Sequence, residues 1–257
     1  MERNSRGDRG QATLWIIVGI AIVILIAVLF VMNRGPKGGQ VDDGSFDINS
    51  YIEKCVRDDV LDVVDEILPH GGFLVNRASK NYNNISIEYL CYNQGFFKPC
   101  INQHPDYFNE VNNVIKENIV GKINSCFESL DATLVNRGAE VSGGMASLNV
   151  NIVPDKIVVK INRSMNVIEK EVFQQYDKFD FEITSPIYML MRTALEVVNS
   201  EAQYCYFEYV GYMLMNKDLI IRKTALGDST KIYSMEDYKT GKKLNIAVRG
   251  CAIPPGF

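Results

Sequence analysis

The chain has 257 residues, of which 47% are hydrophobic and 23% charged, and its formal net charge at pH 7 is −4. No basic cluster accompanies this weak negative charge, so we expect no nucleic-acid partner. No P-loop, dinucleotide-binding glycine pattern, HExxH motif or GxSxG motif is present. We therefore expect a non-enzymatic protein without catalytic residues, cofactor or metal, whose long C-terminal part builds one sizeable core.

An apolar segment near the N-terminus is the most distinctive feature of the sequence. Gln11–Asn33 reads QATLWIIVGIAIVILIAVLFVMN, and no charged residue or proline interrupts it between Leu14 and Met32. As a helix, this segment spans a hydrocarbon core of roughly 30 Å. A cleaved signal peptide is the alternative, but its apolar region would be shorter and would end at a pair of small residues. We predict a retained helix in the lipid bilayer.

The residues that precede this segment resemble the signal of archaeal type IV pilin-like proteins, a class III signal. In that family a basic stretch ends in glycine, and a prepilin peptidase cuts between this glycine and a following glutamine. Arg9, Gly10 and Gln11 match those positions. The resemblance implies processing at Gly10–Gln11 and assembly of copies of the chain through the apolar helix. Many pilins carry glutamate at the fifth residue after the cut, where this chain has Trp15, a residue typical of membrane interfaces.

Charges and composition divide the chain into four parts. Arginines precede the apolar segment at positions 3, 6 and 9, and a slightly smaller positive charge follows it, which favours a cytoplasmic N-terminus. We expect a basic leader at residues 1–10, a membrane or filament-core helix at 11–33, a glycine-rich linker at 34–46 and an extracellular domain at 47–257.

Six cysteines all lie in this last part: Cys55, Cys91, Cys100, Cys126, Cys205 and Cys251. An even number on one side of a bilayer is typical of disulfides in an oxidising compartment. The alternative is free thiols buried in a cytosolic domain. We expect Cys91–Cys100 to close a short loop, Cys55–Cys126 to join two helices, and Cys205–Cys251 to form the remaining pair. Asn84 and Asn162 begin N-x-S triplets and are candidate glycosylation sites.

Three segments of this domain have helical periodicity. The first begins at an N-cap, Asp47 or Asn49, and ends at LPHGG, the second spans about 105–130, and the third spans about 187–205. The acidic residues of the first helix lie opposite its apolar stripe, and we interpret them as a solvated face rather than a calcium or acid–base site. These acidic residues are Asp58, Asp59, Asp62, Asp65 and Glu66.

The other segments read as strands and turns. FLVN, ISIEYLCYN and GFFKPC, at 73–76, 85–93 and 95–100, read as short strands. Alternating apolar residues at 148–152 and 157–161 flank Pro154-Asp155-Lys156 and predict a hairpin. Further strands are expected in KFDFEIT, LIIRKT, KIYSM and LNIAVRG. The expected fold class is α+β: an N-terminal transmembrane or pilin-like helix followed by a disulfide-stabilised α+β ectodomain.

The chain has only two histidines, His70 and His104, each next to a turn signal. We interpret both as ordinary surface or turn residues. Cys91, Cys100 and His104 spell C-x8-C-x3-H, but this is a weak zinc pattern because no fourth ligand lies nearby.

These features predict a structural subunit of a pilus-like filament or of the cell envelope, anchored in the membrane before assembly. A monomeric tethered receptor or adhesin is an alternative. A membrane-anchored extracytoplasmic enzyme with a site assembled from scattered residues is another.

Overall fold

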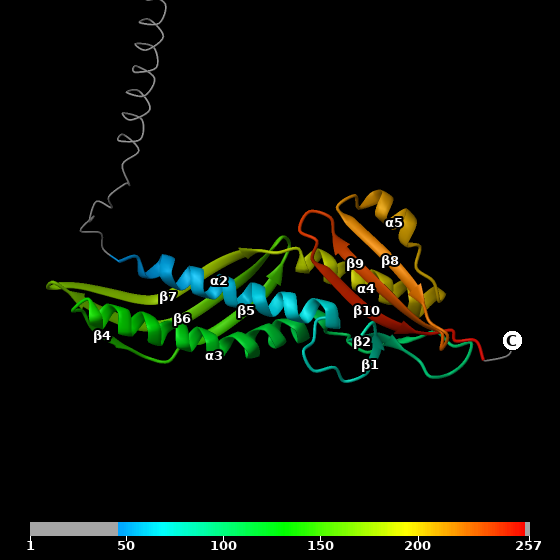
Figure 1. Ribbon diagram of the computed structural model, residues 1–257, viewed down its shortest axis with the longest axis horizontal. Helices are drawn as coiled ribbons and strands as arrows, with labels where there is room; N and C mark the ends of the chain where they lie inside the picture. The colour runs from blue at the N-terminus through cyan, green and yellow to red at the C-terminus, as the bar shows by residue number, and fades with distance from the viewer. Residues whose placement is uncertain (1–45, 255–257) are drawn as a thin grey trace, which may run out of the picture. The chain divides into compact units, whose positions relative to one another are not determined.

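The computed structural model describes residues 46–254. The chain divides into two units, Met1–Phe46 and Asp47–Phe257, and only the second is described at length. The leader, the apolar segment expected to form a helix and nearly all of the linker lie outside the described residues, as do Gly10 and Gln11, where processing is expected. No helix between residues 46 and 254 combines the length and the apolar character needed to cross a membrane. The described unit is α+β, as expected, with helices packed on two separate sheets (Figure 1).

The first sheet is four-stranded and carries two long helices on one face. The elements of this layer are α2 (Ile48–Ile67), α3 (Tyr107–Asn136), β4 (Glu140–Gly143), β5 (Ser147–Val153), β6 (Lys156–Glu169) and β7 (Val172–Thr184). The short 3-10 helix η1 (Leu68–His70) follows α2 and packs against the second sheet. All pairings are antiparallel, and β7 pairs along nearly the whole of β6. Because β7 occupies one edge of β6, β4 and β5 follow one another along the other edge, with Gly144–Ala146 between them.

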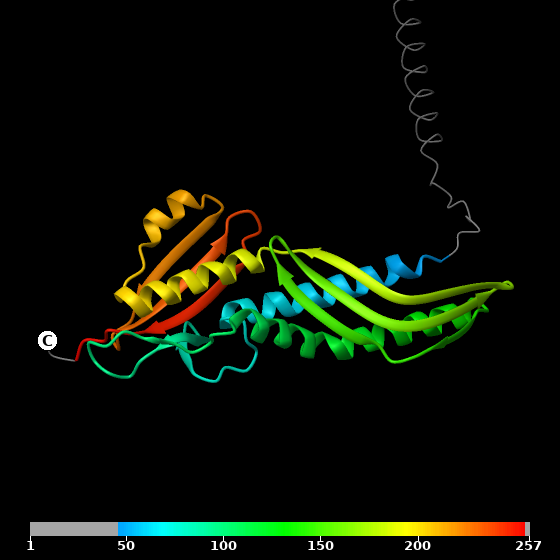
Figure 2. The same ribbon diagram turned by 180° about the vertical axis from the view of Figure 1, so that it is seen from behind.

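The second sheet has six strands and packs against α4 (Figure 2). Its order is β1-β2-β10-β9-β8, with the short β3 paired to β2. The elements are β1 (Ser79–Tyr82), β2 (Ile85–Tyr92), β3 (Ile101–Asn102), α4 (Ile187–Tyr204), α5 (Tyr209–Met215), β8 (Leu219–Ala225), β9 (Thr230–Asp237) and β10 (Lys243–Arg249). Strand β10 runs parallel to β2 and antiparallel to β9.

Helix α2 forms where its sequence predicts it. The Asp47 side chain caps it by accepting a hydrogen bond of 3.2 Å from the backbone N–H of Ser50. Its apolar stripe is buried against α3 and the first sheet, where Phe127 of α3 meets Phe179 of β7 at 5.3 Å between ring centroids. The five acidic residues lie on the outer side, four of them exposed and Asp59 half-buried. The interpretation of this face as solvated is confirmed.

Several predicted boundaries are wrong. Residues 73–76 form bends rather than a strand, and the first strand is instead the polar segment SKNY at 79–82. It pairs with β2 through the turn Asn83-Asn84, whose φ angles of 51° and 63° suit asparagine. GFFKPC forms a loop instead of a strand. The Cys91–Cys100 disulfide and backbone hydrogen bonds to residues 251 and 252 fix its conformation. Helix α3 continues past residue 130 to Asn136, and α5 was not expected.

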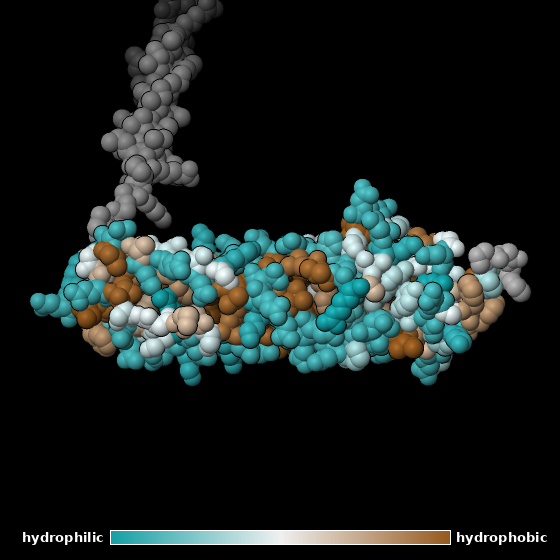
Figure 3. Space-filling view, turned by 90° about the horizontal axis from the view of Figure 1, so that it is seen from below, coloured by the Kyte–Doolittle hydropathy of each residue, from teal (hydrophilic) through white to brown (hydrophobic). Residues whose placement is uncertain are grey.

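The surface of the described unit is mainly hydrophilic on the side drawn in Figure 3, where hydrophobic side chains form several separate groups. Scattered apolar side chains of this kind are normal for a protein surface. On this side, therefore, the described residues present no single dominant apolar interface.

Candidate functional site

All six cysteines form disulfides, and the three pairs are the expected ones. Cys55–Cys126 joins α2 to α3, with the Cα atoms 6.4 Å apart. Cys91–Cys100 closes the loop between β2 and β3 at a Cα separation of 5.3 Å, and Cys205–Cys251 joins the end of α4 to the segment after β10 at 5.8 Å. The alternative of six free thiols is thus wrong. The C-x8-C-x3-H pattern is not a metal site, because two of its members are bonded to each other.

A buried histidine lies between two carboxylates. His104 is 2% exposed and Glu88 is 1% exposed. His104 Nε2 lies 3.3 Å from Glu88 Oε1 on β2, and its Nδ1 lies 2.8 Å from Glu110 Oε2 on α3. Glu88 Oε1 also accepts a hydrogen bond from the backbone N–H of Ala78, and Arg77 lies 3.8 Å from Glu110. The interpretation of His104 as a surface or turn residue is therefore wrong, because partners from two other elements cover and bind it.

The two carboxylates control the charge of this imidazole. Burial by itself lowers the pKa of His104, but hydrogen bonds to Glu88 and Glu110 and their negative charges outweigh it and raise the pKa above 6.5. In the protonated form, both ring nitrogens donate, one to each carboxylate. His70, by contrast, is half-buried and its Nδ1 lies 2.8 Å from the carbonyl oxygen of Ser86, which agrees with its interpretation as a turn residue.

A second buried carboxylate links α4 to the second sheet. Glu201 is fully buried, and its Oε2 accepts a hydrogen bond of 2.5 Å from Lys231 Nζ. Its Oε1 accepts a hydrogen bond from the Tyr233 hydroxyl, whose pKa is raised by burial and by this bond. Lys231 also donates to the carbonyl oxygen of Cys205. Burial and the charge of Lys231 lower the pKa of the neighbouring Lys223. These groups anchor the disulfide-bonded end of α4.

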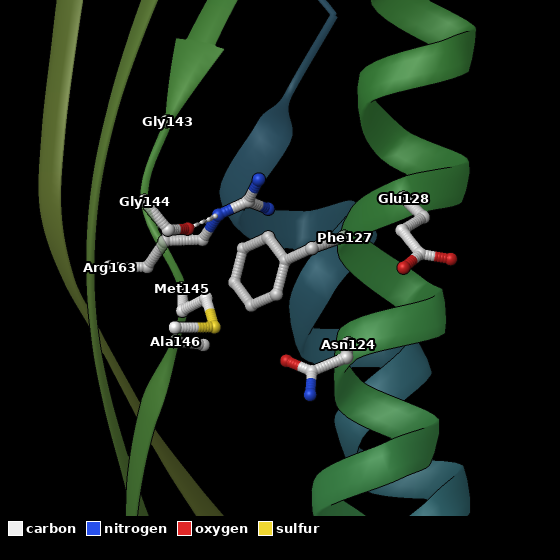
Figure 4. Close-up of a pocket in the computed structure, with 8 residues that line it drawn as sticks. All are labelled: Asn124, Phe127, Glu128, Gly143, Gly144, Met145, Ala146 and Arg163. Carbon is white, nitrogen blue, oxygen red and sulfur yellow. Dashed lines mark hydrogen bonds between the residues drawn. The ribbon is translucent and has the colours of Figure 1, made fainter.

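A third buried charge lies beside a hollow of about 340 Å³ between α3 and the segment Gly143–Ala146, which leads from the end of β4 to β5 (Figure 4). Arg163 of β6 is held there by a hydrogen bond of 2.9 Å to the Gly144 carbonyl oxygen and by an ion pair of 2.7 Å with Asp131. Its guanidinium carbon lies 4.4 Å from the centroid of the Phe127 ring. The arginine thus joins the sheet to α3 where the edge strand is interrupted.

Loss of the Asp131 carboxylate should destabilise the domain. In Asp131→Ala, Arg163 stays in a site where its side chain is only 9% exposed, but without its ionic partner. We expect a loss of about 2–3 kcal/mol in unfolding free energy, measured by urea denaturation. Glu128→Ala is the matched control, because Glu128 is exposed, lies on the same helix and lines the same hollow. This substitution should lower the unfolding free energy by about 0.5 kcal/mol or less. Equal losses in both variants would refute the linking role of Arg163.

The remaining candidate residues are scattered. Asn84 lies in the exposed β1–β2 turn, and Asn162 is exposed on β6. Within residues 46–254, no three histidine, cysteine, aspartate or glutamate side chains converge as a metal site. The sequence interpretation missed Glu88, Glu201 and Arg163. A signal was present for the last two, since each continues the apolar spacing of its own helix or strand.

The comparisons with known proteins find no matching family model, curated protein or solved structure.

Proposed function

We propose that the protein is a structural subunit of the cell envelope, anchored in the membrane or assembled into a pilus-like filament through Gln11–Asn33. Residues 47–257 then face the outside of the cell, as part of a surface layer or of the filament. The disulfides carry this proposal, because all six cysteines of the domain are paired. Structural disulfides persist in oxidising compartments and are rare in the cytosol.

The arrangement of these bonds suits a mechanical role. One bond joins the two long helices, and another fixes the end of α4 to the segment after the last strand. Both restrain segments that are distant in sequence, so they resist partial opening of the domain. The apolar segment Leu14–Met32 supports the membrane or filament-core part of the proposal, because it provides a continuous apolar surface that either lipid or neighbouring copies can bury.

Intact mass of the native protein tests the proposal. Cells are treated with a thiol-alkylating reagent before lysis, and the purified chain is weighed before and after reduction. We expect three disulfides, hence no alkylated cysteine before reduction and a gain of two hydrogens per bond after it. Cleavage at Gly10–Gln11, together with polymer in sheared cell-surface material, would favour the filament. A full-length N-terminus without polymer would favour a permanently tethered protein. Six alkylated cysteines in the native chain would refute an outside location.

A further inference from the structure

A groove with aromatic walls lies where α4, α5 and the β5–β6 turn meet. Its volume is about 280 Å³, and it is separate from the buried charges described above. Figure 2 shows the start of α4 beside this turn, with α5 above α4. The lining residues are Pro154, Asp155, Tyr188, Met189, Arg192, Thr193, Tyr212 and Asn216.

Two tyrosines supply the aromatic walls, and each packs against a phenylalanine. Tyr188 of α4 lies 5.3 Å from Phe108 of α3, and Tyr212 of α5 lies 5.3 Å from Phe207, both measured between ring centroids. Such ring packing fixes the orientation of both tyrosines before any ligand arrives. The groove therefore offers preorganised aromatic surface rather than mobile side chains.

The polar groups of the groove have hydrogen-bonding capacity to spare. Arg192 is exposed, and within residues 46–254 it forms no ion pair or hydrogen bond; the hydroxyl groups of Tyr188 and Tyr212 likewise make none. Asp155 lies in the two-residue turn between β5 and β6, where its φ of 66° fixes its position. The groove thus combines donors on Arg192, an acceptor on Asp155 and two hydroxyls that do both.

We infer that this groove binds one hexose unit of a glycan. A sugar ring presents C–H groups on its faces and hydroxyls on its rim, so aromatic faces and mixed donors and acceptors recognise it together. The volume is slightly below the roughly 300–1,000 Å³ of sites for drug-sized ligands, which suits one ring better than a peptide or lipid chain. The inference is independent of whether the protein is a filament subunit or a tether.

Binding of simple sugars tests the inference. The full chain in lipid nanodiscs is titrated with methyl glucoside, methyl galactoside, methyl mannoside, N-acetylglucosamine and glucuronate, and saturation-transfer NMR detects binding against empty nanodiscs. We expect at least one sugar to bind with a dissociation constant on the order of 1 mM. Arg192→Gln should weaken it about tenfold, since it removes a charged donor. Stronger binding of glucuronate than of the glucoside would place its carboxylate on Arg192.

Matched controls keep the test decisive. Tyr212→Leu should abolish stacking, whereas Tyr238→Leu, which removes a tyrosine that is 70% exposed elsewhere, should leave affinity unchanged. Arg57→Gln on α2 is the corresponding control for Arg192. Binding of none of the five sugars would overturn the inference. So would binding that Arg192→Gln and Tyr212→Leu leave unchanged, or that the control variants weaken equally.

Discussion

Removal of the bond between the two long helices, in the double variant Cys55→Ala/Cys126→Ala, should cost about 4 kcal/mol in unfolding free energy. This bond closes a loop with a sequence separation of 71, so it restricts the unfolded chain strongly. Without the disulfide, the unfolded chain gains conformational freedom, while the packed faces of α2 and α3 in the folded state stay in place. Urea unfolding of the full chain in nonionic detergent, followed by the near-UV circular dichroism of its tyrosines, measures the effect.

The short-loop bond provides the matched control. Cys91–Cys100 has a sequence separation of only 9, so Cys91→Ala/Cys100→Ala should cost about 2–3 kcal/mol. The difference in lost unfolding free energy between the two double variants therefore measures the effect of loop length. If the two losses are equal, or the short loop costs more, the stabilisation does not come from restriction of the unfolded chain.

The pairing of Cys55 with Cys126 could be predicted because both residues lie at the apolar stripes of their helices. The apolar stripe of α2 recurs at Ile52 and Val56, beside Cys55, and the stripe of α3 recurs at Ile123 and Phe127, beside Cys126. Two stripes that pack together bring neighbouring cysteines within reach. The same reasoning predicted the β5–β6 hairpin and α4, since in each case the local pattern and the tertiary burial agree.

Other elements were not predicted because pairing with another strand, rather than their own sequence pattern, stabilises them. Strand β1 has the sequence SKNY, which lacks apolar alternation, and it exists because β2 pairs with it. The second half of β7 lies within KFDFEIT, residues 178–184, which was expected from alternation. Its first half is largely exposed, Val172 and Phe173 included, and is extended because it pairs with β6.

Buried charges were the main omission at the candidate site. Arg163 follows Ile157, Val159 and Ile161 in strict alternation, so the register of β6 places it inward. Glu201 continues the helical spacing of Ala194 and Val198 in α4. A charge on the apolar register predicts a buried ionic partner, but the identity of that partner depends on the tertiary fold. His104 has no such register because it lies in the irregular segment between β3 and α3, where Glu88 and Glu110 approach it.

This histidine should make the domain less stable as pH rises. Its folded-state pKa is raised above the value of 6.5 that an unfolded chain has. The stabilisation is therefore fully present below about pH 6.5 and is lost as pH increases through the folded-state pKa. Urea unfolding at a series of pH values above 6.5 should show the decline, because deprotonation leaves the buried Glu88 carboxylate without a cation.

The variant His104→Ala should remove this pH dependence and lower the stability at neutral pH. In this variant the Glu88 side chain, which is 2% exposed, keeps the Ala78 N–H as its remaining partner among the described residues. We therefore expect a loss of about 3–5 kcal/mol in unfolding free energy. Glu88→Gln in the same background should recover part of that loss, because an amide carries no charge to bury.

His70 is the matched control, since it is the only other histidine of the chain. It is half-buried and lies beside a backbone carbonyl rather than a carboxylate. His70→Gln should therefore keep the decline in stability above pH 6.5 that the unmodified chain shows. A decline that persists in His104→Ala, or that disappears in His70→Gln, would show that the Glu88–His104–Glu110 cluster is not its cause.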